Sequence, residues 1–126
     1  MKHVYLYSDG SCNLDTEIGG YGTILKYNDY TKEFHGTMKN TTNNRMEIMG
    51  IIVGLSQLKE PCEVTVITDS QYVVNTMTKG WKRNKNGDLW EELDNVSKPH
   101  KVTYEWIRGH AGHKENERCD ELAKMR

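Results

Sequence analysis

The stretch His3-Val4-Tyr5-Leu6-Tyr7-Ser8-Asp9 decides the fold, because the later run Val64-Thr65-Val66-Ile67-Thr68-Asp69 repeats its pattern. Both runs are β-branched and aromatic, which predicts strands, and each is followed at once by a small residue, Gly10 or Ser70. If the two strands are parallel neighbours, both acids lie at carboxyl ends, where open α/β sheets place their ligands. The sequence therefore predicts a ligand site at this edge of a sheet.

The remaining elements follow in an order typical of a mixed α/β fold. Strands are expected at 3–9, 23–27, 32–37, 63–68 and 102–107, with a Gly-rich turn at 19–22. A long apolar helix should follow the capping residues 40–43, with short helices from 70 and 88 and a last helix over 114–125. This order predicts one domain, residues 1–126, with a five-stranded mixed sheet whose first three strands are antiparallel, flanked by helices.

Two further acids lie on the predicted helices. Glu47 interrupts the apolar helix and shares a face with Asn43, Gly50 and Gly54, which aims its carboxylate at the strand ends. Asp120 lies in the last helix and could reach the same place. Because burying unpaired carboxylates is costly, these acids need a shared cation, and their oxygen ligands favour divalent ions such as magnesium.

Each acid taken singly has an ordinary alternative explanation. Asp69-Ser70 could cap the following helix, Asp9-Gly10 is a plain turn dipeptide, and Asp120 would pass for a solvated helix charge. Glu47 is harder to explain, because Arg45 two positions earlier points elsewhere on the helix. The metal hypothesis therefore rests on the whole set.

Composition restricts the class of protein. The net charge of -1 lacks the basic balance typical of nucleic-acid binders, and positive charge gathers only around Trp81, at Lys79, Lys82, Arg83 and Lys85. No stretch approaches the length of a membrane span, and the N-terminus enters a strand without a signal-peptide core. Three widely spaced cysteines argue for a reducing cytoplasm and against disulfides or a zinc site.

Four blocks closely resemble the signature blocks of bacterial type 1 ribonuclease H, in the family's order: residues 7–12, 41–47, 68–73 and 109–123. The resemblance implies a ribonuclease H-like α/β fold and an endonuclease that hydrolyses the RNA strand of RNA/DNA hybrids. It implies a two-metal mechanism that leaves 5′-phosphate and 3′-hydroxyl ends. By the resemblance, two Mg²⁺ ions, for which Mn²⁺ can substitute, are held by Asp9, Glu47, Asp69 and Asp120.

The resemblance also implies further site residues. His110, in a glycine-flanked loop, would assist proton transfer or product release. Thr42 matches a phosphate-pocket threonine, although helix capping is an alternative for Thr42 and Asn43 that can hold together with substrate binding. The full set of predicted substrate contacts is Gly10, Ser11, Cys12, Asn13, Thr42, Asn43, Asn44, Gln71, Trp81 and Asn116.

Three features depart from the family pattern. Longer bacterial members carry a basic helix and loop between the two short helices, and here that region shrinks to residues 77–88. This predicts weaker, more salt-sensitive hybrid binding by a monomer, and a partner or attached domain that compensates. Within 13–18, Asp15 and Glu17 add negative charge beside a phosphate path. The chain stops at Arg126, where relatives usually continue, which predicts some loss of stability at that end.

Two rival classes remain. One is a non-catalytic hybrid- or RNA-binding module, which the clustered acids disfavour because negative charge hinders binding to nucleic acid. The other is a resolvase or an integrase-like strand-transfer enzyme on the same fold. The blocks at 43–47 and 109–113 disfavour this second class, because they match the hybrid-cutting family residue for residue. Substrate preference separates them, since resolvases need branched DNA and integrases need viral or transposon ends.

Overall fold

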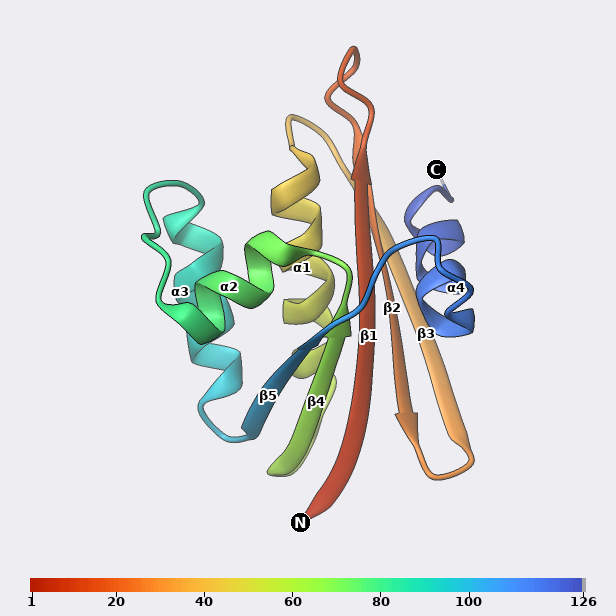
Figure 1. The fold of residues 1–126 in the computed structure, drawn as a ribbon, viewed down its shortest axis with the longest axis vertical. Coiled ribbons are helices and arrows are strands. Elements are labelled where there is room, and N and C mark those ends of the chain that lie inside the picture. Colours follow the sequence, from red (N-terminus) through yellow and green to blue (C-terminus); the bar gives the residue numbers. More distant parts are fainter. Residues whose placement is uncertain (126) are drawn as a thin grey trace.

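A five-stranded mixed sheet forms the centre of the protein, with strand order β3-β2-β1-β4-β5 (Figure 1). The computed structural model describes residues 1–125. Its elements are β1 (Lys2–Cys12), β2 (Gly19–Tyr27), β3 (Tyr30–Met38), α1 (Asn43–Ser56), β4 (Cys62–Thr68), α2 (Gln71–Lys79), α3 (Gly87–Ser97), β5 (Lys101–Trp106) and α4 (Lys114–Ala123). β1, β2 and β3 pair antiparallel, whereas β1, β4 and β5 pair parallel. The predicted fold class is confirmed.

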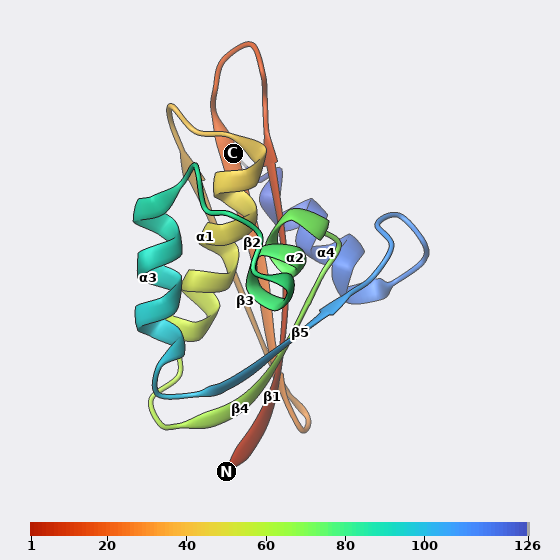
Figure 2. The same ribbon diagram turned by 60° about the vertical axis from the view of Figure 1, so that its left-hand side comes forward.

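Helices cover both faces of the sheet (Figure 2). On one face, Thr23 Oγ1 in β2 donates to the Gly50 carbonyl of α1 at 2.6 Å. The preceding residue, Gly22, lies against the backbone of α4. Because successive residues of a strand point to opposite faces, α1 and α4 enclose the sheet between them. α3 packs on the outer side of α1, so that Trp90 and Leu93 join the buried core.

Three predicted boundaries are wrong. The Gly-rich stretch 19–22 is not a turn but the start of β2, because it pairs with β1 on one side and with β3 on the other. Side chains at Gly20 and Gly22 would clash with the α4 backbone. These glycines therefore mark helix-on-sheet packing. The first strand does not end at Asp9 but runs on to Cys12, because β2 keeps pairing with it as far as Gly19. The last helix ends at Ala123 rather than at 125, and Arg126 lies outside the described residues.

The connector between α2 and α3, residues 80–86, contains no helix. Arg83 of this connector pairs with Asp94 of α3 at 2.6 Å and lies over the Trp90 ring, 5.5 Å from its centroid. Asn86 donates to the Tyr72 hydroxyl of α2 at 3.1 Å. The extra basic helix is therefore absent, as predicted, and part of the remaining positive charge is used to hold the connector on the body.

The structure bears on two features of the composition, the cysteines and the apolar segments. Cys12, Cys62 and Cys119 are all free thiols, and the last two are buried. Among residues 1–125, no helix combines the length and apolar character that a bilayer crossing requires.

Candidate metal centre

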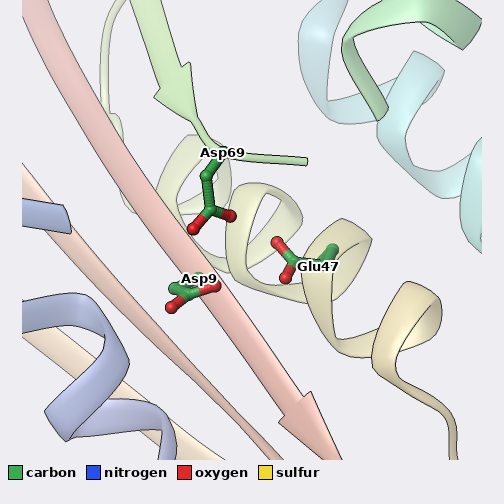
Figure 3. Close-up of side chains that lie close together, drawn as sticks. All are labelled: Asp9, Glu47 and Asp69. Atoms are coloured by element: carbon green, nitrogen blue, oxygen red, sulfur yellow. The ribbon is translucent and has the colours of Figure 1, made fainter. Parts of the chain in front are cut away.

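Asp9, Glu47 and Asp69 converge where β1 and β4 separate (Figure 3). The last parallel pair of these strands joins Tyr7 to Ile67, so each aspartate lies just beyond the paired region. Glu47 reaches the same point from the N-terminal half of α1. Each of the three carboxyl groups offers an oxygen within 4.8 Å of the others. The predicted meeting of these three acids is therefore observed.

Gly10 allows α1 to approach β1 this closely. A Cβ at this position would lie 2.5 Å from the Glu47 backbone nitrogen and 2.8 Å from the Met46 Cβ. The Gly10 N–H also donates to Asp9 Oδ1 at 2.9 Å. Gly10 therefore sets the positions of two of the acids, which explains why a glycine follows Asp9 although the strand continues there.

The three acids have no basic side chain paired with them among the described residues. Asp9 is 7% exposed, and burial together with the charge of Asp69 raises the pKa of Asp9 to about 7. Burial and the charge of Asp9 likewise raise the pKa of Glu47 well above its ordinary value. Among the described residues no basic side chain forms an ion pair with these carboxylates, and the buried Glu47 Oε2 has no hydrogen-bond partner.

This environment suits a divalent ion. A bound cation would offset the desolvation and mutual repulsion that disfavour the charged carboxylates. Carboxylate oxygens are also the ligands that Mg²⁺ prefers in proteins, usually with only a few of them from the protein. Asp9, Glu47 and Asp69 therefore fit a metal, and the orphaned Glu47 oxygen is the clearest sign of it.

Asp120 lies beside the three acids rather than among them. It is half-buried on α4, and its Oδ2 accepts a hydrogen bond from Lys124 at 3.1 Å. Its charge still acts on Asp9, since it adds to the larger effects of burial and Asp69 in raising the pKa of that group. The structure thus places Asp120 near the site, and its role as a fourth ligand remains a prediction.

Asp69 has more contacts than the other two acids. Asn116 is buried in α4 and donates to Asp69 Oδ2 at 3.4 Å, while the Trp106 indole donates to the Asp69 carbonyl at 2.9 Å. Gly109 also packs on this carboxyl group, where a Cβ would lie 2.6 Å from Oδ2. Trp106 and Gly109 were not predicted as site residues, because a strand-end aromatic and a loop glycine carry no chemistry that a sequence displays.

His110 follows directly after Gly109. Its side chain is exposed, and its backbone adopts the left-handed region with φ of 54°. The loop is therefore anchored beside Asp69 through Gly109, while the imidazole of His110 remains open to solvent.

The predicted substrate contacts differ in how free their polar groups are. Thr42 caps α1 by accepting from the Arg45 N–H at 3.1 Å, so the capping alternative is observed. Cys12 donates to the Thr41 carbonyl, and Asn13 Oδ1 accepts from two N–H groups of the following turn. Ser11 is partly buried near the end of β1. Asn43, Asn44, Gln71 and Trp81 are exposed, as are Asn13 and Thr42.

Comparison with known proteins decides the family. The RNase H family model matches residues 1–126. The chain belongs to the RNase H family. It is 50% identical to the Ribonuclease H of Brucella anthropi over 137 residues, covering 98% of this chain and 89% of that protein. It is 47% identical to the Ribonuclease H of Rhizobium meliloti, covering 98% and 90%.

Solved structures agree with this membership. LC9-RNase H1, a type 1 RNase H with the type 2 active-site motif, superimposes with a TM-score of 0.84 and 31% identity. The match covers 98% of this chain and 71% of that one. The predicted resemblance to bacterial type 1 RNase H is thereby confirmed. The 137-residue alignment with Brucella anthropi exceeds the 126 residues of this chain, so that relative carries internal residues that are missing here.

Proposed function

We propose that this protein is a metal-dependent endonuclease that hydrolyses the RNA strand of RNA/DNA hybrids. Family membership supports the reaction class, and the cluster of three acids, Asp9 buried and the other two partly buried, with no basic side chain paired to them among the described residues, carries the proposal for this chain. Such a cluster destabilises a protein unless a cation binds there, so its presence calls for a function. We further propose that the products carry 5′-phosphate and 3′-hydroxyl ends.

Asp9, Glu47 and Asp69 would hold Mg²⁺, with Mn²⁺ as a substitute and Asp120 as the fourth acid. In a two-metal site, the ions lower the pKa of the attacking water and stabilise charge on the leaving oxygen. Gly10 keeps Asp9 and Glu47 together, and Asn116 orients the Asp69 carboxylate. His110, exposed in the loop that Gly109 packs against Asp69, would take up or release a proton as the RNA is cut and the product leaves.

The hybrid would lie across the N-terminal ends of α1 and α2. Asn43, Asn44 and Gln71 are exposed there, close in sequence to Glu47 and Asp69, and their amides can bind 2′-hydroxyls in a shallow minor groove. Gly10, Ser11, Cys12, Asn13, Thr42, Trp81 and Asn116 complete the proposed substrate set. Because these contacts are mainly to the sugar–phosphate backbone, we expect little sequence preference.

The short connector between α2 and α3 should weaken binding. It presents Lys82 and Lys85 to solvent but uses Arg83 internally, so few cations remain to contact phosphates. We therefore propose a single-domain monomer whose hybrid affinity is low and salt-sensitive, and which a partner or attached domain would assist. The three free thiols support a cytoplasmic location.

Cleavage of end-labelled RNA would test this function. The substrates are an RNA/DNA hybrid, single-stranded RNA, duplex RNA and duplex DNA, each with Mg²⁺, and Asp9→Asn is the blank against contaminating nuclease. We expect cutting of the hybrid alone, abolished in Asp9→Asn. If neither Mg²⁺ nor Mn²⁺ supports cutting while the hybrid still binds, the protein is a binding module instead.

A further inference from the structure

We propose that Trp106 is a positioning residue that fixes Asp69 and the His110 loop relative to each other. The inference rests on the proposed function, because it assigns Trp106 a role in the same metal centre. It concerns an outer contact of the site, since Trp106 touches the backbone of Asp69 and not the reacting atoms.

Asp69 occupies a junction where its carbonyl belongs to neither neighbouring element. β4 ends at Thr68, and α2 begins at Gln71 after the cap residue Ser70. The Asp69 carbonyl therefore needs a partner outside the strand pairing and the helix. The Trp106 indole supplies it at 2.9 Å.

A second bond joins the same two segments. The Ile107 N–H donates to the Thr68 carbonyl at 3.0 Å. Two consecutive residues at the end of β5 thus bind two consecutive carbonyls at the end of β4. Gly109 packs on the Asp69 carboxyl group two residues later, so the segment that leads from Trp106 to His110 is held to Asp69 at two points and to Thr68 at a third.

Packing alone does not account for an indole at this position. Trp106 is 43% exposed, in a groove of about 320 Å³ along α2 that is lined by Gln71, Val74, Asn75, Thr78 and Lys79. A side chain so exposed gains only part of the stabilisation that a buried indole obtains. What it offers instead is an N–H that reaches the Asp69 carbonyl.

As a consequence, the acids differ in how firmly hydrogen bonds hold them in place. Asp69 is held through its backbone by Trp106 and through its carboxylate by Asn116, whereas Glu47 has an oxygen without a partner. Asp69 is therefore the fixed ligand against which a metal would be placed. Outer contacts of this kind commonly change metal affinity or activity about 10- to 100-fold when they are removed.

The substitution Trp106→Phe tests this role, because it keeps an aromatic ring and removes the N–H. Trp90→Phe is the matched control, since the buried Trp90 of α3 has no partner for its indole nitrogen. Two readouts are needed: the Mg²⁺ and Mn²⁺ concentrations that half-saturate the thermal stabilisation of the protein, and kcat and KM for hybrid cleavage.

We expect Trp106→Phe to raise the half-saturating metal concentration and lower kcat, each by about 10-fold, with little change in KM. Trp90→Phe should lower the melting temperature and leave the half-saturating concentration unchanged. Equal metal dependence in the two variants would overturn the inference. If the wild-type protein cuts no hybrid, the proposed function fails, and the metal titration still decides for or against Trp106.

Discussion

The acidic centre and the basic connector differ in how their charges are satisfied. Asp9, Glu47 and Asp69 are gathered in a partly buried site, and among the described residues no basic side chain forms an ion pair with them. The connector is exposed, yet Arg83 is already paired with Asp94. Charge that the fold leaves unsatisfied points to a ligand, whereas charge that the fold satisfies contributes mainly to stability.

The largest effect expected from this contrast is on activity. Asp9→Asn should lower kcat for hybrid cleavage on the order of 10³-fold or more, because it removes a ligand charge from the metal centre. Asp29→Asn, the same change in the exposed β2–β3 turn, should leave the rate unaltered. Rates measured at saturating Mg²⁺ compare the two, and equal losses would show that the acidic centre has no special role.

The next effect concerns stability of the metal-free protein. The pKa of Asp9 is raised from 3.8 to about 7 in the folded state, so the folded protein binds more protons than the unfolded chain between these values. The free energy of unfolding should therefore fall as pH rises from about 4 to about 7, on the order of 2–4 kcal/mol.

Urea unfolding across this pH range, with chelator present, measures that fall. Asp9→Asn should make the fall smaller, with the part due to the raised pKa of Glu47 remaining, and saturating Mg²⁺ should restore stability at the upper end of the range. An unchanged profile in Asp9→Asn would mean that Asp9 is not the group that titrates.

Substitutions in the connector should have smaller effects, on hybrid binding at Lys82 and on stability at Arg83. Lys82 makes no ion pair within residues 1–125, so Lys82→Ala should weaken hybrid binding and reduce the slope of log K against log salt by about 1. Arg83→Ala should mainly lower the free energy of unfolding, by about 0.5–1 kcal/mol. Filter binding over a salt series measures the first effect, and urea unfolding measures the second. A loss of binding only in Arg83→Ala, with a loss of stability only in Lys82→Ala, would contradict this assignment.

The turn at 13–18 should give the smallest effect. The Thr41 N–H donates to the Glu17 carbonyl, which places the Glu17 backbone beside Thr41, one residue before the Thr42 cap. Glu17 has φ of 57°, a region that asparagine tolerates better, so Glu17→Asn removes charge without straining the turn. We expect hybrid affinity to rise about two-fold at low salt and not at high salt. Asp29→Asn is again the control, and an equal gain there would indicate a general charge effect.

The residues that carry the chemistry could be read from the sequence because their types and order are specific. Asp9, Glu47 and Asp69 end or interrupt apolar runs, which distinguishes them from ordinary surface charges. Their meeting then follows from the parallel pairing of β1 with β4. The five-stranded mixed sheet was predictable for the same reason, since the strand runs and the helix patterns are distinct.

What the sequence could not show depends on contacts between distant segments. Gly20 and Gly22 suggest a turn until α4 is seen to pack on them. Arg83 counts as a free cation until Asp94, on the next helix, is found beside it. Trp106 has no local signal, because its hydrogen bond joins two strand ends far apart in the chain.

Dependence of hybrid cleavage on divalent metal tests the central claim most directly. The rate is measured on the wild-type protein after chelation and again after Mg²⁺ is added back. The predicted result is a rate at the level of Asp9→Asn under chelation and full recovery with Mg²⁺. Undiminished cleavage in excess chelator would contradict the assignment of Asp9, Glu47 and Asp69 as a metal centre.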